Sequence, residues 1–256
     1  MKALFTLIAA FAYLPFIPSS AGPELSNQAA TGTVNRQKKP GTGKLLVYSG
    51  KIMSKVISAP IETIAKTPLK DIPSLPHKSL YWDIGLHVEI DASVGISYGV
   101  TMKQGSSLLV HSVMLYQFDQ PYQTILYDYL RHSSSILKSS GGSLTGENKL
   151  MVTGSETVES LSCTHLREDN GNGNQNDHWM SKQVPGFLEI GNKVITIDPS
   201  LTMTSNDNIF KWGGLVKMTG TFNDLKAATF VNYNVALQEV NTDMDFPSSD
   251  FDVPLQ

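Results

Sequence analysis

Residues 80–102 alternate between apolar and polar side chains with a period of two. Successive side chains of a β-strand point to opposite faces, so this pattern predicts a strand with one buried face and one solvated face. The run of more than twenty residues is longer than strands of globular proteins usually are. We therefore expect the chain to fold back or bulge near Ser93, Gly95 or Gly99, where glycine permits the change of direction.

Further segments also have the character of strands. Residues 108–118 are largely apolar, which predicts a central strand buried on both faces. Residues 187–190 and 193–197 are separated only by Gly191 and Asn192, the spacing of a two-residue hairpin. Other expected strands are 209–222 and 231–237, and weaker patterns are found at 149–153 and 157–166.

One segment has helical spacing. Asp119 is a suitable N-cap, Pro121 suits the first turn, and apolar residues follow at helical intervals up to Leu137. Two serines and two glycines at 139–142 would end the helix. These elements predict a mainly β domain over residues 80–238, with one inserted amphipathic helix. A sandwich or jelly-roll-like pair of antiparallel sheets fits them best.

The N-terminus has the layout of a secretory signal peptide over residues 1–21. Lys2 precedes an apolar run at 3–17, and Ser19 and Ala21 occupy the −3 and −1 positions of a cleavage site before Gly22. The run is short for a membrane-spanning helix, which needs about twenty apolar residues. We expect a secreted or extracytoplasmic protein. The alternatives are a buried N-terminal helix or strand, and an uncleaved segment lying on a membrane.

Charge is unevenly distributed along this chain of net charge −3. Residues 36–70 carry +7, inside a proline-punctuated basic arm expected over 22–79, and residues 239–256 form an acidic tail of −5. A basic arm attracts phosphates and anionic lipid headgroups. The alternatives are a solvated linker and an arm paired with the acidic tail. The candidate residues for polyanion or membrane binding are Arg36, Lys38, Lys39, Lys44, Lys51 and Lys55.

Catalytic and metal-binding motifs are weak in this sequence. The single cysteine, Cys163, excludes an intrachain disulfide and a multi-cysteine zinc site, and its neighbour His165 would share its strand face. Residues 168–177 suggest a calcium loop but lack the required glycine and glutamate. We assign no catalytic residue, no metal and no cofactor, and an enzyme with an unrecognised site stays open as a third alternative. Four residues could ligate a metal but also fit a solvated strand face: Asp83, His87, Glu89 and Asp91.

Together these features favour an exported, non-enzymatic β-rich binding or structural protein. The order of basic arm, linker, β-rich core and helix loosely resembles matrix proteins of negative-strand RNA viruses, with Pro121-Tyr122, Ile125-Leu126 and Leu137-Lys138 similar to one matrix segment. The resemblance implies the alternative: an intracellular, membrane-peripheral structural protein. Its partners would be an anionic membrane surface or nucleic acid bound through residues 36–70, with self-association also expected.

Overall fold

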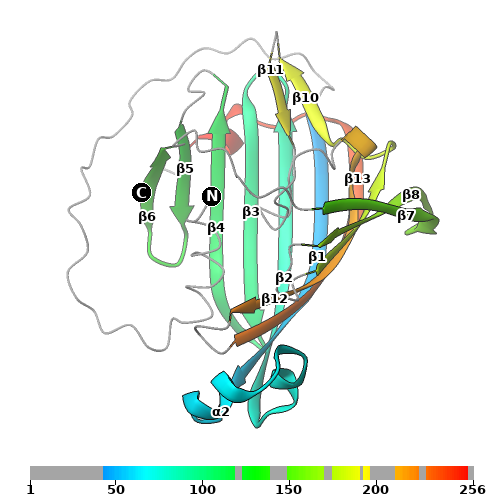
Figure 1. Cartoon of the computed structure of the whole chain (residues 1–256). Coiled ribbons are helices and arrows are strands. Elements are labelled where there is room, and N and C mark those ends of the chain that lie inside the picture. The colour runs from blue at the N-terminus through cyan, green and yellow to red at the C-terminus, as the bar shows by residue number, and fades with distance from the viewer. Residues whose placement is uncertain are drawn as a thin grey trace.

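The computed structural model describes residues 43–118, 123–138, 149–169, 175–190, 193–196, 211–224 and 229–252 (Figure 1). In these ranges eleven strands form one antiparallel sheet in the order β6-β5-β4-β3-β2-β1-β13-β12-β9-β8-β7, and β10 pairs with β11. The strands are β1 (Gly43–Ile57), β2 (His77–Asp91), β3 (Gly95–Gln104), β4 (Ser107–Gln117), β5 (Gln123–Asp128), β6 (Ser133–Lys138), β7 (Lys149–Val158), β8 (Leu161–Asp169), β9 (Gln175–Ser181), β10 (Phe187–Ile190), β11 (Lys193–Thr196), β12 (Gly214–Asp224) and β13 (Thr229–Met244). Short helical turns are α2 (Ile61–Lys66), η1 (Leu69–Ser74) and η3 (Ser248–Phe251).

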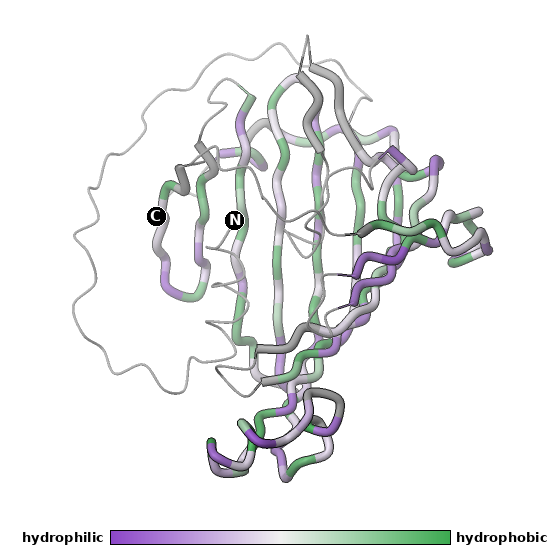
Figure 2. Tube along the Cα trace, viewed as in Figure 1, coloured by the Kyte–Doolittle hydropathy of each residue, from purple (hydrophilic) through white to green (hydrophobic). Residues whose placement is uncertain are grey.

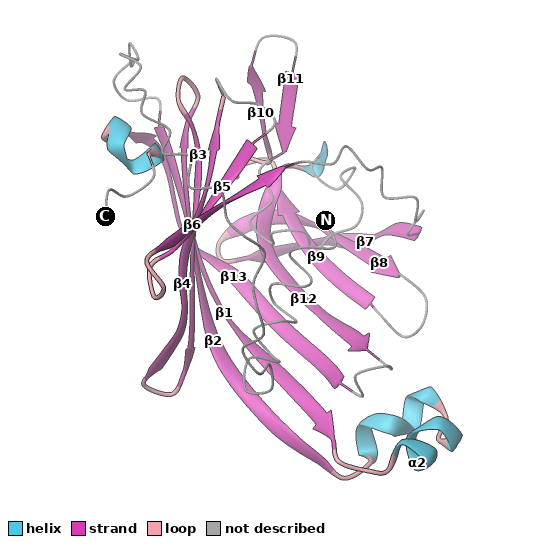
Figure 3. Ribbon diagram, turned by 90° about the vertical axis from the view of Figure 1, so that its left-hand side faces the viewer, coloured by secondary structure: helices cyan, strands magenta, loops and turns pink. Residues whose placement is uncertain are grey.

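The large sheet is strongly bent. In Figure 3 strands β3 to β6 are seen nearly edge-on, while β12, β9 and β8 lie nearly face-on. The Tyr48 hydroxyl on β1 donates a hydrogen bond to the Leu215 carbonyl on β12 at 2.9 Å, across the intervening β13. Such a reach requires the strands to curve toward that side. We call the side that carries Tyr48 the concave face and the opposite side the convex face.

The main apolar core lies on the concave face. Hydrophobic and hydrophilic residues alternate along the long strands (Figure 2). Because successive side chains of a strand point to opposite faces, the hydrophobic set lies on one face. Register aligns Trp82 on β2 with Ile52 on β1, which in turn lies opposite Tyr233 on β13. This cluster continues to Leu166 on β8 and Met180 on β9. Burial of this face by the bend supplies the hydrophobic contribution that holds a single sheet together.

Three smaller clusters lie on the convex face. The loop between β2 and β3 and the C-terminal η3 close over β1 through Leu45, Val94, Phe246 and Phe251. A second cluster lies on β4 and β5, and a third lies where β1 and β13 meet η1. At the first cluster the Gln117 amide donates to the Phe251 carbonyl at 2.9 Å and anchors η3. The chain beyond β13 is therefore packed against the sheet as far as η3.

The predicted mainly β, antiparallel fold is confirmed. The alternating run at 80–102 forms β2 and β3, which pair antiparallel after a turn that includes Ser93, as expected. The strand at 108–118 is β4, between β3 and β5, and the hairpin at 187–196 is β10 and β11. The two layers expected of a sandwich are here two halves of one continuous bent sheet.

The predicted amphipathic helix is wrong. Residues 123–128 and 133–138 form β5 and β6, and residues 119–122 lie outside the described part. Asp128 makes the turn between the strands, because its Oδ1 accepts the backbone N–H groups of Leu130 and Arg131 at 2.9 and 3.1 Å. His132 completes the turn with a φ of 49°. Ile125 and Tyr127, two residues apart, are then buried on one face.

The prediction of a basic arm over residues 22–79 does not hold from Gly43 onward. Residues 43–57 form β1, which is paired along its length with β2 on one side and β13 on the other. Much of the expected acidic tail belongs to β13 and η3, so the two oppositely charged segments are neighbouring strands. Residues 1–42 lie outside the described part, and with them the expected signal peptide and its cleavage site. Among the described helices, none has the length and apolar character needed to cross a bilayer.

Candidate functional site: polar clusters on strands β8 and β9

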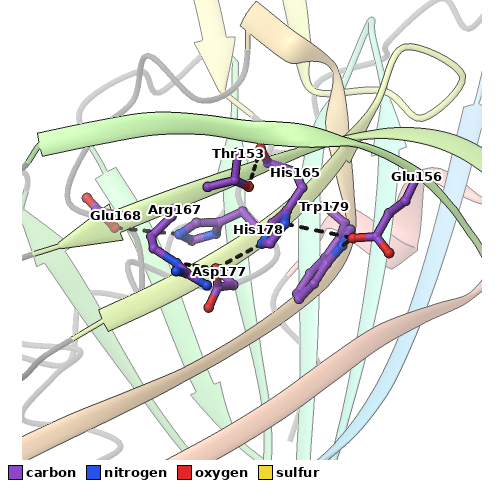
Figure 4. A network of polar contacts seen from close by, with 8 residues as sticks. All are labelled: Thr153, Glu156, His165, Arg167, Glu168, Asp177, His178 and Trp179. Atoms are coloured by element: carbon purple, nitrogen blue, oxygen red, sulfur yellow. Dashed lines mark hydrogen bonds and ion pairs between the residues drawn. The ribbon is translucent and has the colours of Figure 1, made fainter.

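Strands β8 and β9 carry polar side chains on both faces of the sheet (Figure 4). Register places Leu166 opposite His178 and Glu168 opposite Asn176, which puts these four residues on the concave face. The alternate positions, among them His165 opposite Trp179, belong to the convex face. Each strand therefore contributes to two separate polar clusters.

The convex cluster is a closed network of charged groups. His165 Nε2 lies 2.8 Å from Asp177 Oδ1, and its Nδ1 lies 3.8 Å from Glu156 Oε1. Arg167 Nε donates to the same Asp177 oxygen at 2.9 Å. Trp179 Nε1 donates to Glu156 Oε1 at 2.5 Å. Both ring nitrogens of His165 therefore face carboxylates, which hold the ring within the network.

Both sides of the Trp179 ring are also occupied. The His165 ring stacks on it with centroids 4.5 Å apart and planes 6° from parallel. Lys217 Nζ, on the strand at the other side of β9, lies 5.0 Å from the Trp179 ring centroid. The aromatic ring is therefore held within the protein's own contacts and offers no free stacking surface. The convex cluster acts as a structural tie between β7, β8, β9 and β12.

The concave cluster consists of Glu168, Asn176, His178 and Tyr233. Tyr233 Oη donates to Asn176 Oδ1 at 2.5 Å, and Asn176 Nδ2 donates to Glu168 Oε2 at 3.3 Å. His178 Nε2 lies 3.6 Å from the same Glu168 oxygen, and both of these side chains are 0% exposed. Gly220 makes room for the cluster, because a Cβ there would lie 2.5 Å from Tyr233 Oη.

Burial keeps the Tyr233 hydroxyl of this cluster protonated. The pKa of Tyr233 is raised well above its usual range, first by burial and then by the nearby carboxylates of Glu168 and Asp177. Its hydroxyl therefore remains a hydrogen-bond donor. Within the described residues, neither ring nitrogen of His178 makes a hydrogen bond of good geometry. A buried carboxyl next to an imidazole is costly to separate from its partners, so the four groups depend on one another.

Beside the main cluster, the concave face of β3, β4 and β5 is apolar and half-buried, and Tyr98 and Val100 pack against that cluster. Strand pairing extends the concave face from Ile90 on β2 to Ile96 on β3, and from there across β4 and β5. Side chains of this face are more accessible here than in the main cluster. We call this set the apolar strip: Tyr98, Val100, Met114, Tyr116 and Leu126.

Of the six predicted cationic residues, the three that the structure describes do not share one face. Arg36, Lys38 and Lys39 lie outside the described part. Lys44 is opposite Ile90 and so belongs to the concave face, whereas Lys51 and Lys55 lie on the convex face. Lys51 Nζ pairs with Asp83 Oδ1 at 3.1 Å on the convex face. In the described ranges the structure thus splits the expected patch between two faces.

The other residues singled out in the sequence are also accounted for. Asp91 accepts hydrogen bonds from the backbone N–H and hydroxyl of Ser93, so it shapes the β2–β3 turn. His87 Nδ1 lies 3.6 Å from Glu89 Oε1, and no group of three or more metal-ligating side chains occurs in the described part. Burial raises the pKa of the Cys163 thiol, which disfavours a reactive thiolate.

Sequence reasoning missed the concave cluster. It assigned 168–177 to one loop, whereas Glu168 is on β8 and Asn176 is on β9, with residues 170–174 outside the described part. One sequence feature could have indicated it: Asn176, His178 and Met180 are each two residues apart, which is the spacing of side chains on one face of a strand. Tyr233, more than fifty residues away, joins them only through sheet pairing.

No family model matches the sequence, and no curated protein matches it either. Solved structures with distant likeness include a putative outer membrane lipoprotein-sorting protein domain from Vibrio parahaemolyticus, at 11% identity and a TM-score of 0.32, covering 83% of this chain and 90% of that one. A DUF1329 family protein from Desulfovibrio piger has 8% identity and a TM-score of 0.31, with coverages of 83% and 90%. A LolA superfamily protein from Nitrosomonas europaea has 8% identity and a TM-score of 0.29, with coverages of 84% and 91%. Similarity of this degree assigns neither a family nor a function.

Proposed function

We propose that the protein is an exported, non-enzymatic binding protein that holds an apolar or amphiphilic ligand against the apolar strip. The observation that carries the proposal is the strip itself: a row of apolar side chains that remains half-buried on the inner side of a bent sheet. Small-molecule sites in proteins are concave and mostly apolar, with few polar groups. A contiguous apolar surface that stays partly solvated is typical of such sites.

The composition of the strip suits a flexible hydrocarbon chain. Met114 can adapt its shape, and Tyr98 and Tyr116 contribute broad apolar rings. Each methylene group that leaves water contributes about 0.8 kcal/mol. A ligand with an acyl chain of moderate length would therefore gain enough from this surface to bind in the micromolar range, after the cost of association.

The two polar clusters support binding over catalysis. The convex network holds its imidazole between Asp177 and Glu156. The concave cluster encloses the His178 imidazole, whose side chain is 0% exposed. A general base must reach the proton that it removes, directly or through one water. Neither imidazole is placed to do so, whereas the apolar strip needs only contact area.

A charge placed in the strip should abolish ligand binding. We expect Val100→Glu to weaken binding of the fluorescent probe N-phenyl-1-naphthylamine, and its displacement by laurate, at least tenfold, because an unpaired carboxylate in an apolar site opposes burial of the ligand. The matched control is Thr101→Glu, on the same strand and also half-buried, but facing the convex side. Probe binding is measured by titration at constant protein concentration.

Circular dichroism and thermal melting of both variants would separate loss of binding from loss of folding. The proposal fails if the wild-type protein does not bind the probe. It also fails if a folded Val100→Glu variant binds as tightly as Thr101→Glu does.

Export predicts a processed N-terminus. The mass of the protein purified from its native source should correspond to a chain that begins at Gly22, because Ser19 and Ala21 fit the −3 and −1 positions of a signal-peptidase site. Intact-mass spectrometry measures this directly. A mass that includes residues 1–21 would contradict cleavage and would favour the membrane-peripheral alternative, with the apolar segment retained.

A further inference from the structure

The convex face has a hollow of about 450 Å³ over β2, β1 and β13, well away from the apolar strip. Register arranges its side chains in two rows across the three strands. Met53 lies between Tyr81 and Asn232, and Lys51 lies between Asp83 and Asn234. The intervening residues point to the concave face, so they contribute only backbone to the hollow.

An aromatic ring and two amides in this hollow are not used by the fold. Tyr81 is 63% exposed, which is unusual for so large an apolar side chain. Within the described part of the chain, no hydrogen bond engages the side-chain amide of Asn232 or Asn234. The two asparagines are two positions apart on one strand, so their amides lie about 7 Å from each other on the same face.

The charges of the hollow cancel. Lys51 and Asp83 pair at 3.1 Å on its surface, with side chains 84% and 59% exposed. An anion would have to compete with Asp83 for Lys51, the only lysine among the described lining residues, and a cation would have to compete with Lys51 for Asp83. With Lys51 and Asp83 paired, the other lining residues offer uncharged groups, which suits a neutral ligand that forms many hydrogen bonds.

The backbone around the hollow is already paired. β1, β2 and β13 are internal strands, each hydrogen-bonded on both sides. A peptide that binds by adding a strand needs a free edge, which these strands do not offer. A ligand must instead be recognised by side chains alone.

We propose that this hollow binds a neutral glycan chain. An amide both donates and accepts hydrogen bonds, as a sugar hydroxyl pair requires. The Tyr81 ring supplies an apolar face for the C–H side of a pyranose ring. Thr219 of β12 lies opposite Asn234 and extends the row of hydroxyl and amide groups. Strands are about 4.8 Å apart, so the row presents polar groups at intervals comparable to successive sugar units.

The test is titration of the full chain with neutral oligosaccharides: cellotetraose, maltotetraose and chitotetraose. We expect at least one to bind with a Kd in the range of about 0.1–1 mM, measured by calorimetry and by amide chemical-shift changes at β1, β2 and β13. Tyr81→Ala should weaken binding at least tenfold, and the double variant Asn232→Ala/Asn234→Ala should do the same. The matched control is Asn241→Ala, an exposed asparagine further along β13 and outside the hollow, which should bind as the wild type does.

The proposal is overturned if none of the three oligosaccharides binds at a ligand concentration of about tenfold the upper Kd given above. It is also overturned if folded Tyr81→Ala binds them unchanged, or if the shift changes lie on other strands. Binding of heparin or anionic vesicles that persists in Tyr81→Ala, without any neutral glycan binding, would likewise contradict it.

Discussion

Replacing Glu168 by alanine should lower the free energy of unfolding by about 3–5 kcal/mol, which is the usual cost of removing one partner from a buried polar pair. Glu168 and His178 are both fully buried, and Asn176 also donates to the Glu168 carboxyl. Without Glu168, the Asn176 amide loses an acceptor and the imidazole loses its only close carboxyl among the described residues. Urea unfolding followed by circular dichroism measures the loss.

A double-mutant cycle gives the sharper form of this prediction. Replacing a buried polar pair with apolar groups of similar size is often neutral or stabilising. We therefore expect Glu168→Leu/His178→Leu to be more stable than Glu168→Leu alone, with a coupling energy of about 1–3 kcal/mol. Glu168→Gln, which keeps the shape and an acceptor, should be milder than Glu168→Ala. Additive effects, or a Glu168→Ala loss below about 1 kcal/mol, would show that the cluster is not coupled.

The same cluster shows where sequence reasoning stops. The alternation of residues 80–102 is a local property of a strand, so it predicted β2, β3 and the turn between them. The cluster instead depends on which strands become neighbours. Glu168 meets His178 through the β8–β9 register, and Tyr233 arrives from β13, two strands away from β9. Long-range pairing of this kind is not encoded in the period of either segment.

The two largest errors have local physical causes. Apolar residues near Ile125 and Leu137 fit both a helical period and two short strands, and the Asp128 turn decides between them. The lysines of residues 43–57 suggested a solvated arm, yet the inward positions of the same segment carry Leu46, Tyr48 and Ile52. A strand with Lys51 and Lys55 on its outer face has the same net charge as a basic arm of the same sequence. Charge counting alone could not distinguish them, whereas alternation could have done so.

A second large effect should appear in the pH dependence of stability, through Glu89. This residue lies on the convex face of β2, between Leu45 and Ser97, and its side chain is 17% exposed. Burial, and then the nearby Asp250 carboxylate of η3, raise the pKa of Glu89 from 4.5 to about 7. His87 and Tyr129 also face this carboxyl, and burial raises the pKa of Tyr129 as well. The C-terminal segment is thus packed over the Glu89 carboxyl group, and this packing favours the protonated form of that group.

The sign follows from the direction of that shift. The folded state binds the Glu89 proton more tightly than the unfolded state, so the stabilisation is complete below about pH 4.5 and is lost as the pH rises through about 7. The complete loss amounts to roughly 3.4 kcal/mol, since one pKa unit corresponds to 1.36 kcal/mol. In Glu89→Gln this contribution is absent. The wild type should therefore lose about 2–3 kcal/mol more than Glu89→Gln between pH 5 and pH 8, as measured by urea unfolding.

We also predict which part of the protein loosens first as Glu89 ionises. Ionised Glu89 repels Asp250, so the first region to loosen above pH 7 should be η3, which is held by Phe251 packing and by the Gln117 hydrogen bond to the Phe251 carbonyl. Hydrogen exchange of the η3 amides should accelerate from pH 6 to pH 8 in the wild type, beyond the intrinsic pH effect, and not in Glu89→Gln. Asp250→Asn, which removes the repulsion but not the burial, should reduce the pH dependence only in part, because burial is the larger cause of the shift. Equal pH dependence in wild type and Glu89→Gln would contradict this account and would assign the titration to other groups.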